Sequence, residues 1–275
     1  MVTETKVPIE RPARLPPPGV LWHYTTLDAI EYFLKGDIAF SHYKFLNDDA
    51  ELRYGKELLS RIAKKTKNEG LKRLTDSDWF DQFEDAYLFC LSRFGDNLYQ
   101  WRSYAPNGGV AIGFNRRALV KAVYDGAERV VESADVKPAC RLLTCRYDDA
   151  FAEKVVVRLL AAKSGQCLCN GVACKNFGKY LAAVQRIALA QKNPSFLEEH
   201  EERFLIVGKL RKQFQVIKGK PCIIVGNSEI GRAITCVRLS PHGDCKRNKL
   251  LVEMLKEKYD LTFDVMESAS SCNGK

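Results

Sequence analysis

The sequence predicts an α+β protein with a single domain. Segments with strand spacing and segments with helix spacing both occur along the chain, without the strict βαβ alternation of a parallel sheet. The 275 residues are 46% hydrophobic and 28% charged, which is typical of a globular protein long enough to bury its own core. No internal repeat is found. These observations favour one mixed or antiparallel sheet with helices packed on it.

Proline and apolar residues divide the chain into three regions. Residues 1–19 contain five prolines, including the run Pro16–Pro18, and this favours an extended and poorly packed N-terminal arm. Residues 20–268 form the predicted domain. Residues 269–275 are expected to be a flexible C-terminal tail.

The first half of the domain is predicted to begin as strand, helix, strand and helix. Thr25-x-x-Asp28 is a capping box for the first helix, and Gly36 is a natural stop for it. Asn47 or Asp48 is expected to cap the second helix, and Asp96 or Asn97 a third, shorter one. The expected strands are 20–24, 37–41, 86–92 and 110–114, the last after the turn 107–109.

The second half is expected to contain two helices that interrupt a run of strands. The helices are predicted at about 149–162 and 172–191, and a later one at 248–259. The expected strands are 128–136, 141–147, 203–207, 222–225, 233–239 and 262–266.

Charge and hydropathy exclude some classes of protein. The net charge of +9 should attract phosphate-bearing ligands or polyanions. No apolar run is long enough to cross a bilayer, and residues 1–6 lack the apolar core of a secretory signal. We therefore expect a cytoplasmic protein that does not bind a membrane.

The ten cysteines are expected to be reduced thiols, because their spacing is irregular and no export signal precedes them. Cys167-x-Cys169 is shorter than the usual zinc-binding pair and has no histidine nearby, so no metal is expected. Whether the cysteines between Cys140 and Cys174 bind a metal stays open. The sequence also lacks the P-loop, the dinucleotide-binding glycine motif, the Gly-x-Ser-x-Gly elbow and His-Glu-x-x-His.

Five short motifs follow one another in a fixed order. They are Trp22-His23-Tyr24-Thr25, Asn47-Asp48-Asp49-Ala50-Glu51, Phe89-Cys90-Leu91-Ser92, Trp101-x-x-Tyr104-Ala105 and Glu199-x-Glu201-x-Arg203. Together they resemble the domain-of-unknown-function family 2971, an uncharacterised and largely bacterial group, over about residues 20 to 268. Glu202 stands where the family often has an aromatic residue, and Asp49 where proline is frequent. This resemblance implies no activity.

A more distant resemblance, to the ADP-ribosyltransferases, implies one. Those enzymes carry Arg or His on their first strand, a Ser- or Tyr-containing second motif, and a Glu on a later strand, often inside Glu-x-Glu. The chain offers His23, Ser92 and Glu199-x-Glu201 in that order, with a two-helix insertion and without the usual Ser-Thr-Ser around Ser92. The resemblance implies the ADP-ribosyltransferase fold, with NAD as the substrate for transfer of ADP-ribose or for hydrolysis.

This chemistry gives the matched residues expected roles. Breaking the bond between nicotinamide and ribose leaves positive charge on the sugar, which a nearby carboxylate stabilises, and Glu201 is the candidate. Glu199, expected on the same face of an extended strand, would orient or deprotonate the nucleophile, and repulsion would raise one of the two pKa values. The other expected contacts are His23 with the adenosine ribose, Tyr24 or Tyr104 with nicotinamide, Ser92 as the second motif, and Arg93 or Arg203 with the pyrophosphate.

Structural explanations and other functions stand beside this hypothesis. Thr25 and Asn47 could be only helix caps, Trp101 and Tyr104 packing residues, and residues 198–202 a solvated acidic stretch. A non-catalytic nucleic-acid-binding module is favoured by the charge and by a basic stretch, and a nucleotide-sensing scaffold also stays open. If ADP-ribose is transferred, the acceptor is expected to be a protein or a nucleic acid. The basic stretch comprises Lys209, Arg211, Lys212, Lys218 and Lys220.

Overall fold

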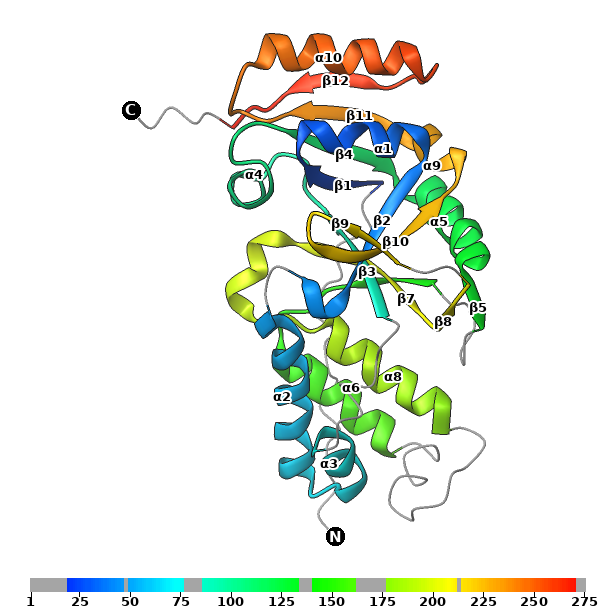
Figure 1. The fold of residues 1–275 in the computed structure, drawn as a ribbon. Coiled ribbons are helices and arrows are strands. Elements are labelled where there is room, and N and C mark those ends of the chain that lie inside the picture. The colour runs from blue at the N-terminus through cyan, green and yellow to red at the C-terminus, as the bar shows by residue number, and fades with distance from the viewer. Residues whose placement is uncertain are drawn as a thin grey trace.

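Ten strands form one mixed sheet in the part of the chain that the structure describes (Figure 1). The computed structural model describes residues 19–46, 49–76, 86–133, 140–161, 177–211 and 214–270. Neighbouring strands of this sheet are antiparallel, except for the parallel pair β11 and β12. The predicted α+β class with a mixed, mostly antiparallel sheet is therefore confirmed.

The long path of the sheet runs through eight strands. In spatial order they are β12 (Asp264–Glu267), β11 (Ile234–Leu239), β4 (Val110–Asn115), β1 (Val20–Thr25), β3 (Ala86–Ser92), β2 (Asp37–His42), β10 (Lys220–Gly226) and β9 (Gln215–Ile217). Two further strands, β7 (Glu201–Val207) and β6 (Cys140–Thr144), leave this path at β3.

The sheet branches at β3. One edge of β3 pairs with β1 at Ser92 and with β2 at Tyr87 and Leu88. The other edge pairs with β7 along the whole strand, from Ala86 to Ser92. The apolar run of β3 is buried on both faces, as its sequence predicts, because Tyr87, Phe89 and Leu91 lie in the main core and Ala86 and Leu88 in a smaller cluster on the other face.

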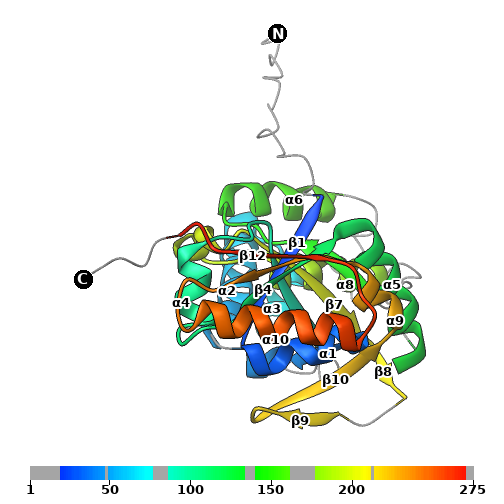
Figure 2. The same cartoon turned by 90° about the horizontal axis from the view of Figure 1, so that it is seen from above.

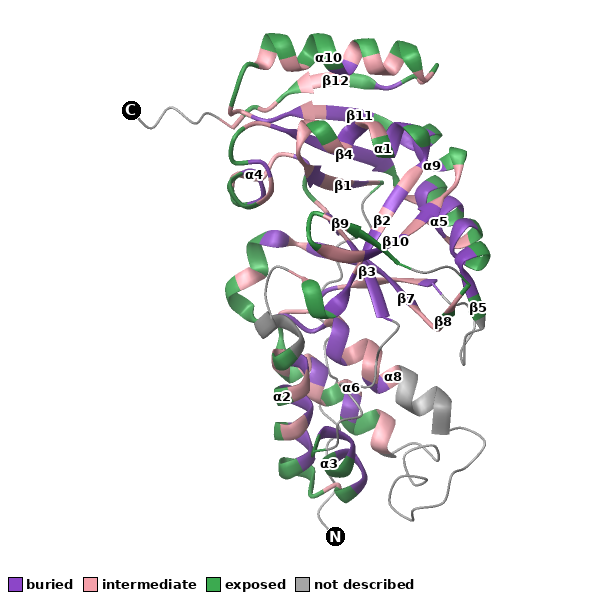
Figure 3. Cartoon of the chain, in the orientation of Figure 1, coloured by how far each residue is buried: buried purple, intermediate pink, exposed green. Residues whose placement is uncertain are grey.

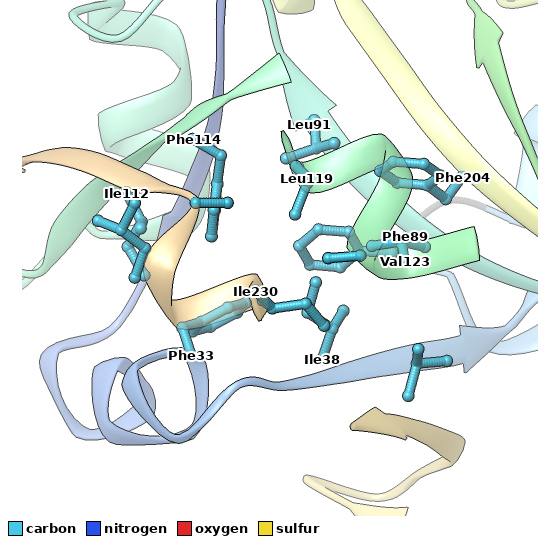
Figure 4. Packing of buried hydrophobic residues seen from close by; sticks show 14 of the residues in the cluster. Phe33, Ile38, Phe89, Leu91, Ile112, Phe114, Leu119, Val123, Phe204 and Ile230 are labelled. Carbon is cyan, nitrogen blue, oxygen red and sulfur yellow. The ribbon is translucent and has the colours of Figure 1, made fainter. Parts of the chain in front are cut away.

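The main hydrophobic core lies on the face of the sheet that carries Phe89, Ile112 and Phe204 (Figure 4). We call it the core face. Four of the described helices contribute buried residues to this core, among them Phe33, Val123, Ile230 and Val252. They are α1 (Ile30–Lys35), α5 (Arg116–Val130), α9 (Ser228–Arg232) and α10 (Cys245–Lys258).

Four helices form a separate bundle below the sheet in Figure 1. They are α2 (Asp49–Thr66), α3 (Glu69–Asp76), α6 (Asp149–Ala161) and α8 (Phe177–Ala190). The bundle has its own core, which includes Leu59, Leu71, Val156 and Val184. The last two helices confirm, in their described parts, the helices predicted at about 149–162 and 172–191.

Two helices occupy the outer margins of the sheet. The short helix α4 (Leu98–Tyr104) packs Trp101 and Ala105 against Tyr24 of β1. The long helix α10 (Cys245–Lys258) lies beside β12 as the outermost element (Figure 2). Buried residues follow the central strands, and exposed residues cover the outer side of α10 (Figure 3).

Some predicted boundaries and caps are confirmed. Gly36 ends α1 in a left-handed conformation with φ of 91°, and the Asn97 side chain accepts a hydrogen bond from Tyr99 N at the start of α4. The proline-rich arm up to residue 18 and the proposed caps Asn47 and Asp48 lie outside the described residues.

Other predictions at this level are confirmed only in part or are wrong. Of the strand expected at 128–136, residues 128–130 belong to the end of α5, 131–133 form the strand β5 (Val131–Ser133), which pairs with β8 (Lys209–Leu210), and 134–136 lie outside the described residues. Thr25 is not a helix cap, because β1 includes it and Thr26 takes the capping position without a side-chain hydrogen bond.

Candidate active site

The strand register determines which candidate residues share a face of the sheet. Trp22 lies opposite Ser92, and Ser92 lies opposite Glu201 on the next strand. Side chains of residues directly opposite one another project from the same face. These three residues therefore lie on the face opposite the core face, which we call the charged face.

Four ionisable side chains meet on the charged face. The Lys192 Nζ contacts Oε2 of Glu199 and lies 2.7 Å from Oε2 of Glu201. Arg203 donates to Glu201 from Nε at 2.8 Å and from Nη2 at 2.6 Å, a bidentate arrangement. No side chain of the four is more than 6% exposed. We call this group the buried charge cluster.

Main-chain contacts hold the two carboxylate-bearing residues in place. The carbonyl oxygen of Glu199 accepts hydrogen bonds from Ser92 Oγ at 2.9 Å and from Gln100 Nε2 at 3.3 Å. The backbone N–H of Glu201 donates to the Tyr147 hydroxyl at 3.0 Å. Strand β3, helix α4 and the segment after β6 thus converge on the start of β7.

The expectation that Glu199 and Glu201 lie on one extended strand is wrong. Glu199 ends a 3₁₀ helix, Pro194–Glu199, and the chain turns at His200, whose φ of 45° is left-handed, before β7 begins at Glu201. Both carboxylates nevertheless reach the same ammonium group, that of Lys192, because the turn folds the 3₁₀ helix back onto β7.

The pKa of Glu201 is lower than that of an ordinary glutamate. Burial alone raises the pKa of this carboxyl group, but the charges of Arg203 and Lys192, with hydrogen bonds from Arg203 and Cys90, outweigh burial and lower the pKa to about 2. Glu201 is therefore not the one of the two carboxyl groups whose pKa repulsion would raise. The carboxylate is ionised at neutral pH, which suits it to stabilising a cation and not to transferring a proton.

Tyr104 borders the buried charge cluster. Burial raises the pKa of its phenol, and the negative charges of Glu199 and Glu201 raise it further, so the hydroxyl is neutral at physiological pH. Tyr24 has a different environment. Its hydroxyl donates to the Phe94 carbonyl and accepts from Asn97 N, both at 2.9 Å, so it anchors the loop between β3 and α4.

His23 does not share the face of Glu201. It lies opposite Ile112, and its ring is 4.5 Å from the Phe89 ring and 5.0 Å from the Phe33 ring, centroid to centroid, on the core face. Its Nδ1 donates to the Cys90 carbonyl at 2.9 Å. Burial lowers the pKa of His23 to about 4, although the Cys90 hydrogen bond raises it slightly. The imidazole is therefore neutral, and the sheet separates it from the buried charge cluster.

The two candidate arginines are engaged in different ion pairs. Arg203 holds Glu201 and also donates to the Leu189 carbonyl at 3.1 Å. Arg93 lies 3.6 Å from Glu202, which Arg116 contacts at 3.1 Å. Since Glu202 follows Glu201 on β7, its side chain projects to the core face. The structure therefore brings Arg203, but not Arg93, to the buried charge cluster.

Sequence reasoning missed three residues of the site: Lys192, Gln100 and Tyr147. Lys192 follows a helix and precedes Asn193-Pro194, a context that usually indicates an exposed lysine. The sequence indicates a partner for Lys192 only through Glu199 and Glu201, seven and nine residues later. It does not show that the chain folds back to bring them together.

The described part of the chain was compared with what a metal site and a membrane-spanning helix require. No group of three or more His, Cys, Asp or Glu residues there could hold a metal ion. Cys140 and Cys145 are buried thiols, while Cys167, Cys169 and Cys174 lie outside the described residues. None of the described helices combines the length and the apolar character needed to span a membrane.

The basic stretch is divided among separate contacts. Lys209 pairs with Glu132 at 2.9 Å, Arg211 donates to the Val131 carbonyl, and Lys218 donates to Thr26 Oγ1. Lys212 lies outside the described residues. These contacts lie on β8 and on the β9–β10 hairpin, away from the buried charge cluster.

Comparison with known proteins shows similarity to one protein family. No curated protein and no solved structure matches the chain. Residues 100–204 match the model of a family described as Protein of unknown function (DUF2971). This span is shorter than the residues 20–268 over which the motifs resemble that family, and it does not include His23 or Ser92. From α4 to β7, including the whole buried charge cluster, the chain is therefore similar to the DUF2971 family.

Proposed function

We propose that this protein is an enzyme of ADP-ribosyltransferase type that cleaves NAD at the bond between nicotinamide and ribose. One observation carries the proposal: Glu199 and Glu201 converge on Lys192, beside Ser92 and Tyr104, although these residues come from separate segments. The motifs that suggested this chemistry thus supply neighbouring groups, apart from His23 and Arg93.

The burial of the charges supports a role beyond stability. Removing two carboxylates and two cations from water is costly, and apolar residues of similar size often stabilise a core as well or better. A buried ion network therefore gives little net stability. We infer that these charges are retained because the site uses them.

In the proposed reaction Glu201 acts through its charge. The bond between C1′ of the ribose and the nicotinamide nitrogen breaks, and its electron pair leaves with nicotinamide. The sugar becomes an oxocarbenium-like cation, which the ionised Glu201 stabilises. Water or a macromolecular acceptor then attacks C1′ and loses a proton, for which Glu199 is the proposed acceptor.

The remaining candidates receive revised roles. Tyr104, with its neutral phenol beside the carboxylates, is the proposed stacking partner for nicotinamide. Ser92 and Gln100 hold the backbone of Glu199. His23 is assigned to the packing of β1 on β3, because its ring lies on the core face. The acceptor, a protein or a nucleic acid, is a further part of the proposal.

The experiment measures nicotinamide released from labelled NAD by the full chain, alone and with protein or RNA acceptors. Release is expected from the unmodified protein and is expected to fall at least about 100-fold in Glu201→Gln, which keeps the shape of the side chain but removes its charge. Glu199→Gln is expected to slow the reaction less, because the nucleophile loses its proton only after the bond to nicotinamide has broken.

Glu202→Gln is the matched control. Glu202 is the next residue of the same strand, equally buried and also paired with arginine, but it lies on the core face. Equal loss of nicotinamide release in Glu201→Gln and Glu202→Gln, at equal melting temperatures, would contradict the proposed role of Glu201. Absence of release with every acceptor would contradict the enzyme proposal, and stabilisation by NAD without release would favour a nucleotide-sensing scaffold.

A further inference from the structure

Helix α10 presents apolar side chains to solvent as well as to the protein. Val252 is fully buried against the body of the molecule, whereas Leu250 is 63% exposed and Met254 is 59% exposed. The helix is the outermost element beyond β12, with its outer side facing away from the sheet (Figures 1 and 2). Exposed apolar residues that lie together on an outer helix indicate an interaction surface.

The outward residues form a stripe with coiled-coil spacing. Arg247, Leu250, Met254 and Glu257 are separated by three, four and three residues, and all four are exposed. This spacing keeps them on one side of an α-helix. We call them the outer stripe. A cation stands at its start, two apolar residues at its centre and an anion at its end.

We propose that the outer stripe binds the same stripe of a second copy of this chain, with the two helices antiparallel. A two-fold axis on the outer side of the helix, at the height of residue 252, then brings Leu250 against Met254 of the second copy. The same axis brings Arg247 against Glu257 of the second copy, and each contact occurs twice. The charge order of the stripe is complementary to itself only in the antiparallel direction, because parallel pairing would set Arg247 against Arg247.

The same charges argue against an anionic membrane as the occupant. A lipid-binding helix surrounds its apolar residues with lysine and arginine. Arg247 and Glu257 end the outer stripe, and the lysines of the helix, Lys246, Lys249, Lys256 and Lys258, lie outside it. Lys256 pairs with Glu253 at 3.4 Å and Lys258 with Glu31 at 2.9 Å. An acidic lipid surface offers Glu257 no cation, while Arg247 of a second stripe does.

The dimer is expected to be weak and reversible. One pair of 14-residue helices covers less surface than the interfaces of tight complexes. Sedimentation velocity of the full chain, over a range of concentrations, is therefore expected to show a monomer–dimer equilibrium. Leu250→Asp and Met254→Asp, both at exposed positions that the fold does not need, are expected to abolish the dimer.

A charge exchange tests the antiparallel geometry. Arg247→Glu or Glu257→Arg alone places like charges at both ends of the interface, and each is expected to weaken self-association about tenfold. Mixing the two variants is expected to restore association, because both ion pairs form again between unlike chains. The double variant is expected to dimerise as the unmodified chain does. Lys249→Glu changes the net charge as Arg247→Glu does, but away from the outer stripe, and is expected to leave the dimer unchanged.

Three results would overturn the proposal. The first is a monomer at every concentration. The second is a dimer that survives Leu250→Asp and Met254→Asp, or one that the charge exchange does not restore. The third is a chain that stays monomeric but co-sediments with vesicles of anionic and zwitterionic phospholipid, and loses that binding in Met254→Asp, which would assign the outer stripe to a membrane surface.

Discussion

Glu201 and Glu202 are adjacent, but each belongs to a different ion network. Glu201 meets Lys192 and Arg203 on the charged face, and Glu202 meets arginines on the core face. Both are buried charges, and such charges are stable only with partners at hydrogen-bond distance. Because successive side chains of β7 project to opposite faces, a glutamate one position further along the strand joins the other network.

Replacing Lys192 by Met tests the cost of leaving the carboxylates without their shared cation. Lys192 is 1% exposed and contacts both Glu199 and Glu201, so Lys192→Met is expected to destabilise the protein by about 3–5 kcal/mol at neutral pH. Urea unfolding followed by circular dichroism measures the loss. Lys209→Met removes an exposed ion pair with Glu132 and is expected to cost less than about 1 kcal/mol. Similar costs for both variants would contradict the description of the cluster.

His23 predicts a specific pH dependence. In the unfolded chain its pKa is near 6.5, and in the folded chain it is about 4, so the unfolded state binds more protons between these values. The stability that His23 contributes is therefore complete above pH 6.5 and is lost as the pH falls towards 4, by up to about 1.4 kcal/mol per pH unit. His23→Gln, whose amide can still donate to Cys90, is expected to flatten the curve of unfolding free energy in this window. Parallel curves for both proteins would contradict a neutral His23.

At the scale of elements, the apolar pattern predicts strands better than helices. The run 86–92 is recovered as β3 without error, since an unbroken apolar segment of that length suits a central strand. Helix α5 was missed, although Asn115 caps it and Leu119, Ala122 and Val123 follow helical spacing. The helix ends at Val130, next to Val131, and two adjacent β-branched residues favour a strand locally. Packing on the core face stabilises the helix up to Val130 instead.

The contact between α2 and α8 depends on Gly55. A Cβ atom there would lie 2.2 Å from the Ala188 carbonyl oxygen, a distance that forces the helices apart. Gly55→Ala is therefore expected to destabilise the protein by about 1–3 kcal/mol, although alanine favours a helix by about 1 kcal/mol over glycine. Thermal unfolding measures the effect. Lys64→Ala, on the exposed side of the same helix, should change the stability by less than about 0.5 kcal/mol, and a stabilised Gly55→Ala would contradict the close approach.

At the scale of the molecule, the segment after β12 is tied to the loop between β3 and α4. Asp96, in the loop after β3, accepts hydrogen bonds from Trp101 Nε1, Ser268 Oγ, Ala269 N and Ser270 Oγ, and pairs with Arg238 at 3.3 Å. This carboxylate therefore joins α4, β11 and the segment after β12. The loop that it holds leads directly to Tyr104.

Asp96→Ala is expected to loosen this junction. Loss of the carboxylate leaves Trp101 Nε1 without its acceptor and should cost at least about 2 kcal/mol. Hydrogen–deuterium exchange is expected to accelerate in α4 and at residues 268–270 together, and little elsewhere. Asp125→Asn, which alters an exposed ion pair with Lys121, serves as the control. Faster exchange in α4 alone would contradict a shared anchor.

The sequence by itself determined the α+β class, most strand positions and the helix stop at Gly36, because these depend on local periodicity and turn chemistry. Only the tertiary structure decided that Lys192 joins Glu199 and Glu201, and that the sheet separates His23 from them. The physical reason is that a side chain's face and ionic partners depend on register between strands distant in sequence. Local propensity carries no information about that register.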